Sequence, residues 1–311
     1  LPAWLALAGG GGAGEEIARA AAGRPPDQPD RTDPRWQAPA TVWAAVGDAV
    51  TRCDGAHLAD AAGTVGLPVG VLGERSATED GGVRVHDLTT GPVSAGPPAQ
   101  VVDLSTLWAG PLCASLLADC GAEVVKVVTT GRPDGAAAGN PEWYRLLNGA
   151  KAHLEVDLSG PAGRARLAEL VAGADVVVES ARPRGLEQLG IVAAEVLGAS
   201  DGPRVWVSIT GHGRTSPRVA FGDDAAVAGG LVVEDDDGPW FCGDAIADPL
   251  SGVAAAAAAL DCLSTGRRAL VEVSMAGVAA AHAGPTCVAA GTAAAPRARS
   301  RSGPDDGEDR S

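Results

Sequence analysis

Two adjacent carboxylates, Asp223 and Asp224, are the first residues whose type and spacing favour covalent chemistry. They follow Gly222 and precede an Ala-rich segment. An aspartate is ionised near neutral pH, so it can act as a nucleophile without the general base that a serine needs. The pair also suits the cap of a helix that begins at Ala225, because a carboxylate accepts hydrogen bonds from unpaired N–H groups. Both roles stay open at this point, and one residue can fill both.

Lys126 and Lys151 are the only lysines of the chain, and both lie in the stretch 126–184. This stretch has eight basic and seven acidic side chains, a net charge of +1, which leaves −16 for the rest of a chain whose total is −15. An ammonium group contacts a phosphate as a point charge, and Arg182 and Arg184 add two further cations. The stretch therefore predicts contacts with an anionic ligand, although each residue also fits an ordinary strand-end or loop charge.

A third group of candidates is Trp108, Ala109 and Gly110, which lie between a short apolar strand and a helix with Pro111 in its first turn. Gly110 has no Cβ, and the N-terminus of a helix offers unpaired N–H groups. A phosphate or a pantetheine chain can approach such a backbone closely. On its own, however, the pattern indicates only a βαβ unit.

The segments that must position these residues alternate, from Gln100 onward, between short β-branched runs and Ala/Leu-rich helical stretches. This alternation predicts an α/β fold, with a Rossmann-like parallel sheet flanked by helices. A helix is expected over 246–263, with one more strand after it. The predicted strands are VVDL, EVVKV, HLEVDL, DVVVES, RVWVSIT and ALVEVSM.

These patterns divide the chain into three regions. Residues 1–96 are a loosely specified N-terminal α+β region with proline-rich loops, in which 82–88 alternates as a strand able to pair with a sheet edge. Residues 97–285 form the α/β domain. Residues 286–311 have no periodicity, which predicts a disordered tail.

Composition narrows the classes of function. The 24 Lys+Arg against 39 Asp+Glu produce a field that opposes binding to nucleic acid or to anionic membrane surfaces. The longest apolar stretch is shorter than the roughly 20 residues that span a bilayer. The apolar start lacks a basic region and is interpreted as an incomplete N-terminus, so we expect a cytoplasmic protein. The six cysteines lack metal-ligand spacing, which predicts small buried hydrophobes and no metal site.

Several motifs in order resemble the class III CoA-transferase family, which includes formyl-CoA transferase-like and carnitine CoA-transferase-like enzymes and the α-methylacyl-CoA racemases. The resemblance covers about residues 97–283. In the turn VVESARPRG, Ser180 and Ala181 replace the family's Asn and aromatic residue. The matching motifs are D-L-S-x-x-x-A-G-P at 103–111, G-A-x-V-x-K at 121–126, N-x-x-K at 148–151 and S-x-x-G-x-G at 208–213.

This resemblance implies a transferase that moves CoA from an acyl-CoA to a carboxylic acid through an aspartyl covalent intermediate. Asp224 takes the nucleophile's place in G-x-D, and Asp223 takes the place of an aromatic residue or histidine. Acyl-CoA and a small carboxylic acid are the implied substrates, with no tightly bound cofactor and a homodimer as the assembly. The family's smaller domain is missing, which implies a shortened or divergent member in which residues 1–96 pack in its place. The residues expected to contact CoA are Trp108, Ala109, Gly110, Lys126, Asn148, Lys151, Ser180, Arg182 and Arg184.

Two alternatives remain. A 2-methylacyl-CoA racemase or epimerase needs two bases on opposite faces of one carbon, and His212 and His282 are the remaining candidates for a base, although each also fits a structural role. A non-catalytic acyl-CoA-binding or dimerisation subunit would fit the short chain. Binding of CoA without turnover would distinguish this third hypothesis.

Overall fold

The structure is a computed structural model that describes residues 40–90, 99–131, 133–181, 183–199, 202–235 and 238–284. The chain separates into two compact units, one of which consists of Ala59–Thr286. In the other unit, the described part contains α3 (Ala40–Thr51) and the start of α4 (Gly55–Val65). Asp54 caps α4 by accepting hydrogen bonds from the N–H groups of Ala56 and His57. The tail predicted at 286–311 lies outside the described residues.

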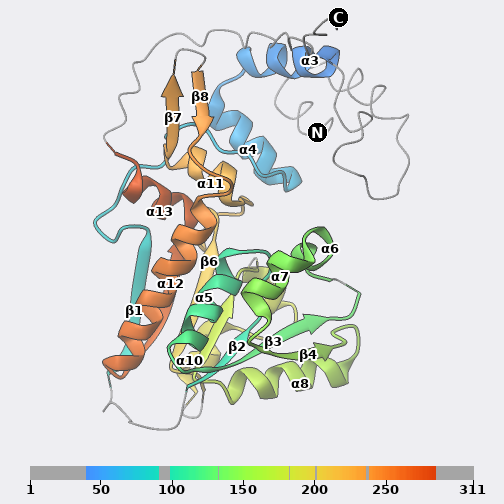
Figure 1. The fold of residues 1–311 in the computed structure, drawn as a ribbon, viewed down its shortest axis with the longest axis vertical. Coiled ribbons are helices and arrows are strands. Elements are labelled where there is room, and N and C mark those ends of the chain that lie inside the picture. Colours follow the sequence, from blue (N-terminus) through green and yellow to red (C-terminus); the bar gives the residue numbers. More distant parts are fainter. Residues whose placement is uncertain are drawn as a thin grey trace, which may run out of the picture. The chain divides into compact units, whose positions relative to one another are not determined.

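The unit Ala59–Thr286 is built on a seven-stranded sheet with the order β1-β9-β6-β5-β2-β3-β4. Six of these strands are parallel, and β1 joins the edge antiparallel to β9. The predicted α/β fold with a mostly parallel sheet is therefore confirmed (Figure 1). The strands are β1 (Val83–Thr90), β2 (Gln100–Asp103), β3 (Glu123–Thr129), β4 (Ala152–Val156), β5 (Val176–Glu179), β6 (Val205–Thr210) and β9 (Arg267–Ser274).

The edge strand β1 comes from the region 1–96, which was predicted to be separate from the α/β domain. Its pairing with β9, from Val83 opposite Val273 onward, confirms that the segment 82–88 pairs with a sheet edge. The loop after α4 also contacts the body of the fold, since the N–H of Gly73 donates to the carbonyl of Val227. Residues 59–90 thus belong to the same compact unit as the α/β domain.

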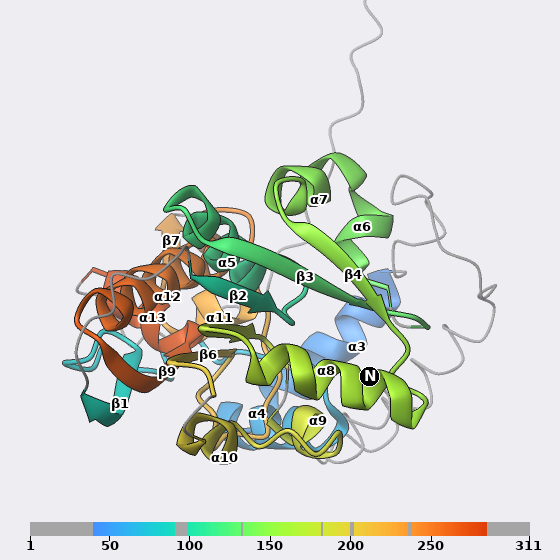
Figure 2. The same ribbon diagram turned by 90° about the horizontal axis from the view of Figure 1, so that it is seen from below.

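Helices cover both faces of the sheet and bury alternate strand residues. On one face, α5 (Ala109–Asp119) and α12 (Ala247–Ser264) pack over Val176 and Val178. On the other face, α8 (Pro161–Ala172) and α10 (Ala193–Gly198) cover Val177 and Trp206 (Figure 2). A period of two along β5 therefore divides the apolar core into two layers. This double burial explains why the strands form continuous valine-rich runs.

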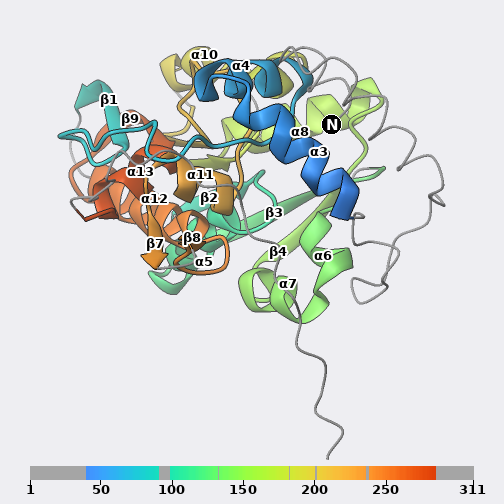
Figure 3. The same ribbon diagram turned by 90° about the horizontal axis from the view of Figure 1, so that it is seen from above.

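The remaining elements gather at the ends of the strands. The helix α11 packs against α13 beside the N-terminal end of α12 (Figure 3). Among the described helices, none has the length and apolar character required to cross a membrane. These elements are α6 (Gly135–Gly139), α7 (Pro141–Asn148), α9 (Pro183–Glu187), α11 (Gly222–Ala228), α13 (Met275–His282) and the hairpin β7 (Val232–Asp235) and β8 (Gly238–Phe241).

Candidate active site

A pocket of about 760 Å³ lies where the parallel strands end. Its walls come from residues just after β2, β5, β6 and β9, from the first turn of α12, and from Asp60, Gly63 and Thr64 of α4. Parallel α/β sheets bind ligands at the carboxyl ends of their strands, since the loops there diverge and leave a crevice. The principal lining residues are Thr106, Leu107, Ala109, Ser180, Ala181, Thr210, Gly211, Arg214, Arg218, Phe221, Asp248 and Met275.

Asp248 is the half-buried carboxylate in the wall of this pocket. It lies in the first turn of α12. Burial raises its pKa to about 6, against the effect of hydrogen bonds from the backbone of Ala109 and Gly222, and the nearby charges of Asp223 and Asp224 raise it further. Gly222 must lack a side chain, because a Cβ there would lie 2.5 Å from Oδ2 of Asp248. A carboxylate with such surroundings remains mostly ionised at neutral pH and is poorly hydrated, as a nucleophile requires.

Asp224, the predicted nucleophile, does not line the pocket. Its Oδ1 accepts the N–H of Phe221 at 2.8 Å, which confirms a capping role, although the helix begins at Gly222 and not at Ala225. Its Oδ2 is buried without a hydrogen-bond partner among the described residues, and burial raises its pKa to about 6. Asp223 accepts the N–H of Ala245 at 2.7 Å and so connects α11 to the segment before α12. Both aspartates thus support the wall that carries Asp248.

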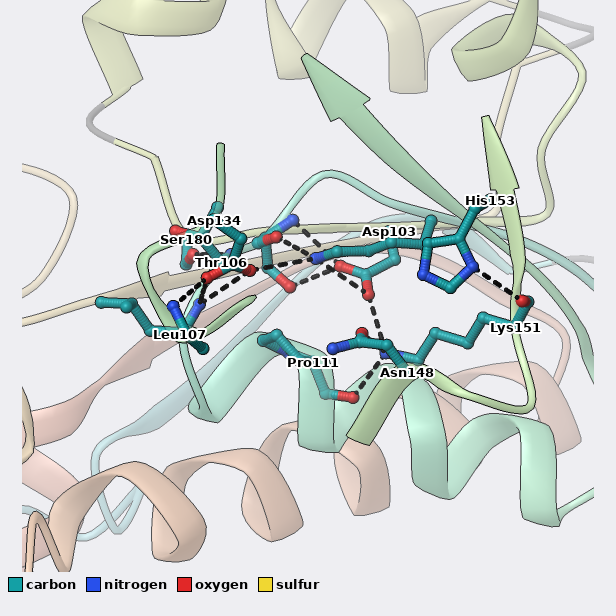
Figure 4. Close-up of polar contacts among 12 residues, drawn as sticks. Asp103, Thr106, Leu107, Pro111, Asp134, Asn148, Lys151, His153 and Ser180 are labelled. Carbon is teal, nitrogen blue, oxygen red and sulfur yellow. Dashed lines mark hydrogen bonds and ion pairs between the residues drawn. The ribbon is translucent and has the colours of Figure 1, made fainter. Parts of the chain in front are cut away.

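The predicted phosphate ligands Lys126 and Lys151 lie in the core, with side-chain exposures of 2% and 1%. Lys151 Nζ is 2.9 Å from Oδ2 of Asp103 and donates to the carbonyl of Pro111 and to Oδ1 of Asn148, both at 2.8 Å. Lys126 Nζ is 3.5 Å from the same Asp103 oxygen. Figure 4 shows Lys151, Asn148 and Pro111 around Asp103. This position does not support the predicted phosphate contacts, because each ammonium group is enclosed by protein oxygens.

Asp103 is the centre of this buried cluster, with no exposed surface. Burial alone would raise the pKa of Asp103, but the charges of Lys126 and Lys151 outweigh that effect and hold the pKa below its usual range. The register of the sheet explains the pairing of Asp103 with Lys126, because Asp103 on β2 lies directly opposite Lys126 on β3. The cluster is therefore a structural ion network beneath the loop that follows β2.

The segment around Gly110 contributes to the site differently from the prediction. Ala109 lines the pocket, whereas Trp108 packs edge-to-face on Trp143 with ring centroids 4.7 Å apart. A Cβ at Gly110 would overlap with the side chain of Ser105. The glycine is therefore required by a close contact within the protein and not by an approaching ligand.

The other predicted residues divide between the pocket and positions elsewhere. Ser180 lines the pocket, Arg182 lies outside the described residues, and the side chain of Arg184 is not described. His212 does not line the pocket, and burial lowers its pKa to about 4. His282 is exposed at the end of α13. Neither histidine is thus placed as a base at this pocket.

The cysteines differ in part from the prediction of burial. Cys113 and Cys262 are buried, whereas Cys120, at the end of α5, and Cys242, after β8, are exposed because both lie where an element terminates. Across the described ranges, no three His, Cys, Asp or Glu side chains meet in a group that could hold a metal ion.

The parallel sheet and the pocket at the carboxyl ends of its strands define an α/β protein with a crevice of the kind that binds ligands. The sequence model of CoA-transferase family III matches residues 99–308, about two thirds of the chain. The protein belongs to this family.

Individual relatives agree with this assignment. The succinyl-CoA–D-citramalate CoA-transferase of Chloroflexus aurantiacus is 32% identical over 182 residues, which are 54% of this chain and 45% of that protein. The succinate–glutarate CoA-transferase of Agrobacterium fabrum is 32% identical over 173 residues, 50% of this chain and 43% of the relative. A CAIB/BAIF family protein from Brucella suis superposes with a TM-score of 0.54 at 26% identity, covering 62% of this chain and 55% of that one. This chain thus spans less than half the length of these two curated relatives.

Proposed function

We propose that the protein transfers CoA from an acyl-CoA thioester to a carboxylic acid, with Asp248 as the covalent nucleophile. The observation that carries the proposal is the position of Asp248 in the pocket wall with a pKa of about 6. At pH 7 about nine tenths of such a group is ionised, so the nucleophile needs no separate base. Relatives named as CoA-transferases support the same chemistry.

The proposed steps balance without a co-reactant. The Asp248 carboxylate attacks the thioester carbonyl, the C–S bond breaks, and CoA thiolate leaves a mixed anhydride. The thiolate then attacks the Asp248 carbonyl, which releases the donor acid and forms an enzyme–CoA thioester. The acceptor carboxylate attacks that thioester, and the thiolate finally takes the acceptor acyl group from the new anhydride. In the last step the bridging oxygen, which came from the acceptor, stays on Asp248.

An oxygen label makes this sequence testable. With an ¹⁸O-labelled acceptor acid, ¹⁸O is expected to enter one aspartate of the enzyme during turnover, and tandem mass spectrometry locates it. We expect the label on Asp248, and Asp248→Asn to lose CoA transfer. Asp224→Asn is the matched control, because it removes a neighbouring carboxylate that lies outside the pocket wall. Label on Asp224, with activity retained in Asp248→Asn, would instead support the nucleophile predicted from the sequence.

The alternatives give different results in the same experiment. A racemase would exchange the α-hydrogen of a 2-methylacyl-CoA with solvent and incorporate no ¹⁸O into the protein. A binding subunit would bind CoA in calorimetry without any transfer. The transferase is favoured because the described pocket has a suitable nucleophile, whereas His212 and His282 are absent from its lining.

We further propose a dicarboxylic donor or acceptor. Arg214 lines the pocket and has an 18% exposed side chain. Its Nη1 contacts Glu179 at 3.2 Å, and its Nε is 3.5 Å from Glu272. Burial raises the pKa of Glu179, which weakens the neutralisation of the guanidinium and favours an added anionic partner. Arg214→Met is therefore expected to raise KM for succinyl-CoA more than for butyryl-CoA, and an equal effect on both would contradict this assignment.

A further inference from the structure

The loop that joins β2 to α5, residues 104–108, is held by charged side chains that approach from beneath it. Lys126 donates to the carbonyl of Ser105. Asp134 accepts the N–H of Leu107, at 3.2 Å from Oδ1. Lys126 Nζ is also 4.0 Å from Oδ2 of Asp134, so the two anchors form one buried group. Figure 4 shows Asp134 beside Leu107. The loop therefore has an ionic support that the ordinary strand-to-helix connection does not require.

The conformation of this loop is one that the local sequence does not favour. Leu107 has a φ of 68°, a left-handed conformation that residues with a Cβ seldom adopt. Its side chain is 37% exposed at the pocket, so burial in the core does not offset the unfavourable backbone. Backbone strain that persists beside a pocket indicates that surrounding contacts impose it. Asp134 contacts the strained Leu107 directly, and Lys126 contacts the loop at Ser105. Further hydrogen bonds from the loop N–H groups reach Asp103 and Ser180.

The loop leads directly into Ala109, and Thr106, Leu107 and Ala109 line the same pocket as Asp248. We propose that Lys126 and Asp134 are positioning residues, which hold the 104–108 loop and so keep the backbone of Ala109 in the pocket wall beside the carboxylate of Asp248. This inference rests on the proposed function, in which Asp248 is the nucleophile. It replaces the predicted contact of Lys126 with a CoA phosphate.

The charges of Lys126 and Asp134 are not among the main direct influences on the pKa of Asp248. The groups that dominate the pKa of Asp248, after burial, are the N–H groups of Ala109 and Gly222 and the carboxylates Asp223 and Asp224 from α11. Lys126 and Asp134 are not among them. A change in the ionisation of Asp248 after substitution of Lys126 or Asp134 would therefore be transmitted through the loop.

The test measures kcat/KM against pH with two donors: a full acyl-CoA, and the same acyl group on N-acetylcysteamine, which has no phosphate. For Lys126→Met we expect a loss of about tenfold or more with both donors and by the same factor. The acid limb of the profile should move up by about one pH unit, because Asp248 loses a hydrogen bond to its charged form. Lys126→Arg should restore much of both effects. Asp134→Ala should reproduce the shift, whereas Asp134→Asn, which keeps an acceptor oxygen, serves as its matched control.

Three results would overturn the inference. A loss confined to the full acyl-CoA would indicate a phosphate contact. A folded Lys126→Met protein with lowered stability but an unmoved acid limb would indicate a structural role alone. Hydrogen–deuterium exchange supplies a readout independent of activity: we expect faster exchange in 104–108 for Lys126→Met and Asp134→Ala, and unchanged exchange would refute the proposal. If the wild-type protein shows no transferase activity while both variants show faster exchange in 104–108, the result counts only against the proposed function.

Discussion

Removal of the Lys151 ammonium group should be among the most destabilising single substitutions in the α/β unit. In Lys151→Met, Asp103 keeps its charge in a site with no exposed surface and loses its partner at 2.9 Å. Breaking a buried pair in this way costs about 3–5 kcal/mol. The acceptor oxygens of Pro111 and Asn148 also lose their donor, and Lys126 at 3.5 Å offsets part of the loss. We therefore expect the free energy of unfolding to fall by about 4 kcal/mol near pH 7.5.

The pH dependence of this loss distinguishes electrostatics from packing. The pKa of Asp103 is lowered in the folded protein, so its contribution to stability is present above the unfolded pKa and is lost as pH falls through the folded pKa. In Lys151→Met that pKa rises, so protonation of Asp103 at acidic pH should recover part of the stability. The deficit of the variant relative to wild type is therefore expected to be smaller at pH 5 than at pH 7.5.

Urea unfolding followed by circular dichroism at both pH values measures these free energies. Arg166→Met is the matched control, because Arg166 pairs with Glu169 at a similar 3.2 Å while the two side chains are 56% and 68% exposed. Such a surface pair is worth about 0–1 kcal/mol. A loss below about 1 kcal/mol for Lys151→Met, equal to that of the control, would refute the account of the cluster.

Three further perturbations follow from the same structure. The pKa of Asp248 is raised to about 6 in the folded state, so the free energy of unfolding falls as pH rises from the unfolded pKa of about 4 to about 6. Asp248→Asn should therefore raise the free energy of unfolding by about 1–2 kcal/mol at pH 8 and leave it nearly unchanged at pH 4, as urea titrations would show. Gly222→Ala places a Cβ against Ala245 and Asp248, and should lower both the melting temperature and transfer activity, unlike Gly160→Ala, which meets open space. Deletion of residues 1–98 removes β1 and exposes the edge of β9, so light scattering should show aggregation or loss of the predicted homodimer; a soluble monomeric fragment would contradict this.

Several strands of the sheet could be predicted from sequence because they are valine-rich runs bounded by turns, as in the segments that form β5 and β6. Asp248 could not be found in this way. The sequence of the segment 246–263 predicts a helix there. The raised pKa of Asp248 in its first turn, however, depends on burial and on Ala109 and Gly222, which come close to it only after folding. A pocket formed by loops from several strands leaves no contiguous signal in the chain.

The lysines show a signal that the sequence does contain. Lys126 lies among the valines of EVVKVV, in a strand of a parallel sheet whose faces are both covered. A cation in such a run indicates a buried ammonium group with a carboxylate partner, and Asp103 at the end of the preceding strand is that partner. Overall charge balance directed the interpretation toward phosphate instead, because counting charges says nothing about their burial.

The antiparallel edge of the sheet also has a consequence for the order of folding during synthesis. His86 of β1 contacts Glu272 of β9, 186 residues later in the chain. At about 5–20 residues per second, a ribosome needs roughly 10–40 s to make the intervening segment, and β1 has no partner strand in that time. Val83 and Val85, which pack against the finished core, alternate with the polar Arg84 and His86. Because of this alternation, the unpaired β1 exposes only one apolar face. The last strand of the sheet to be synthesised, β9, then pairs with the first.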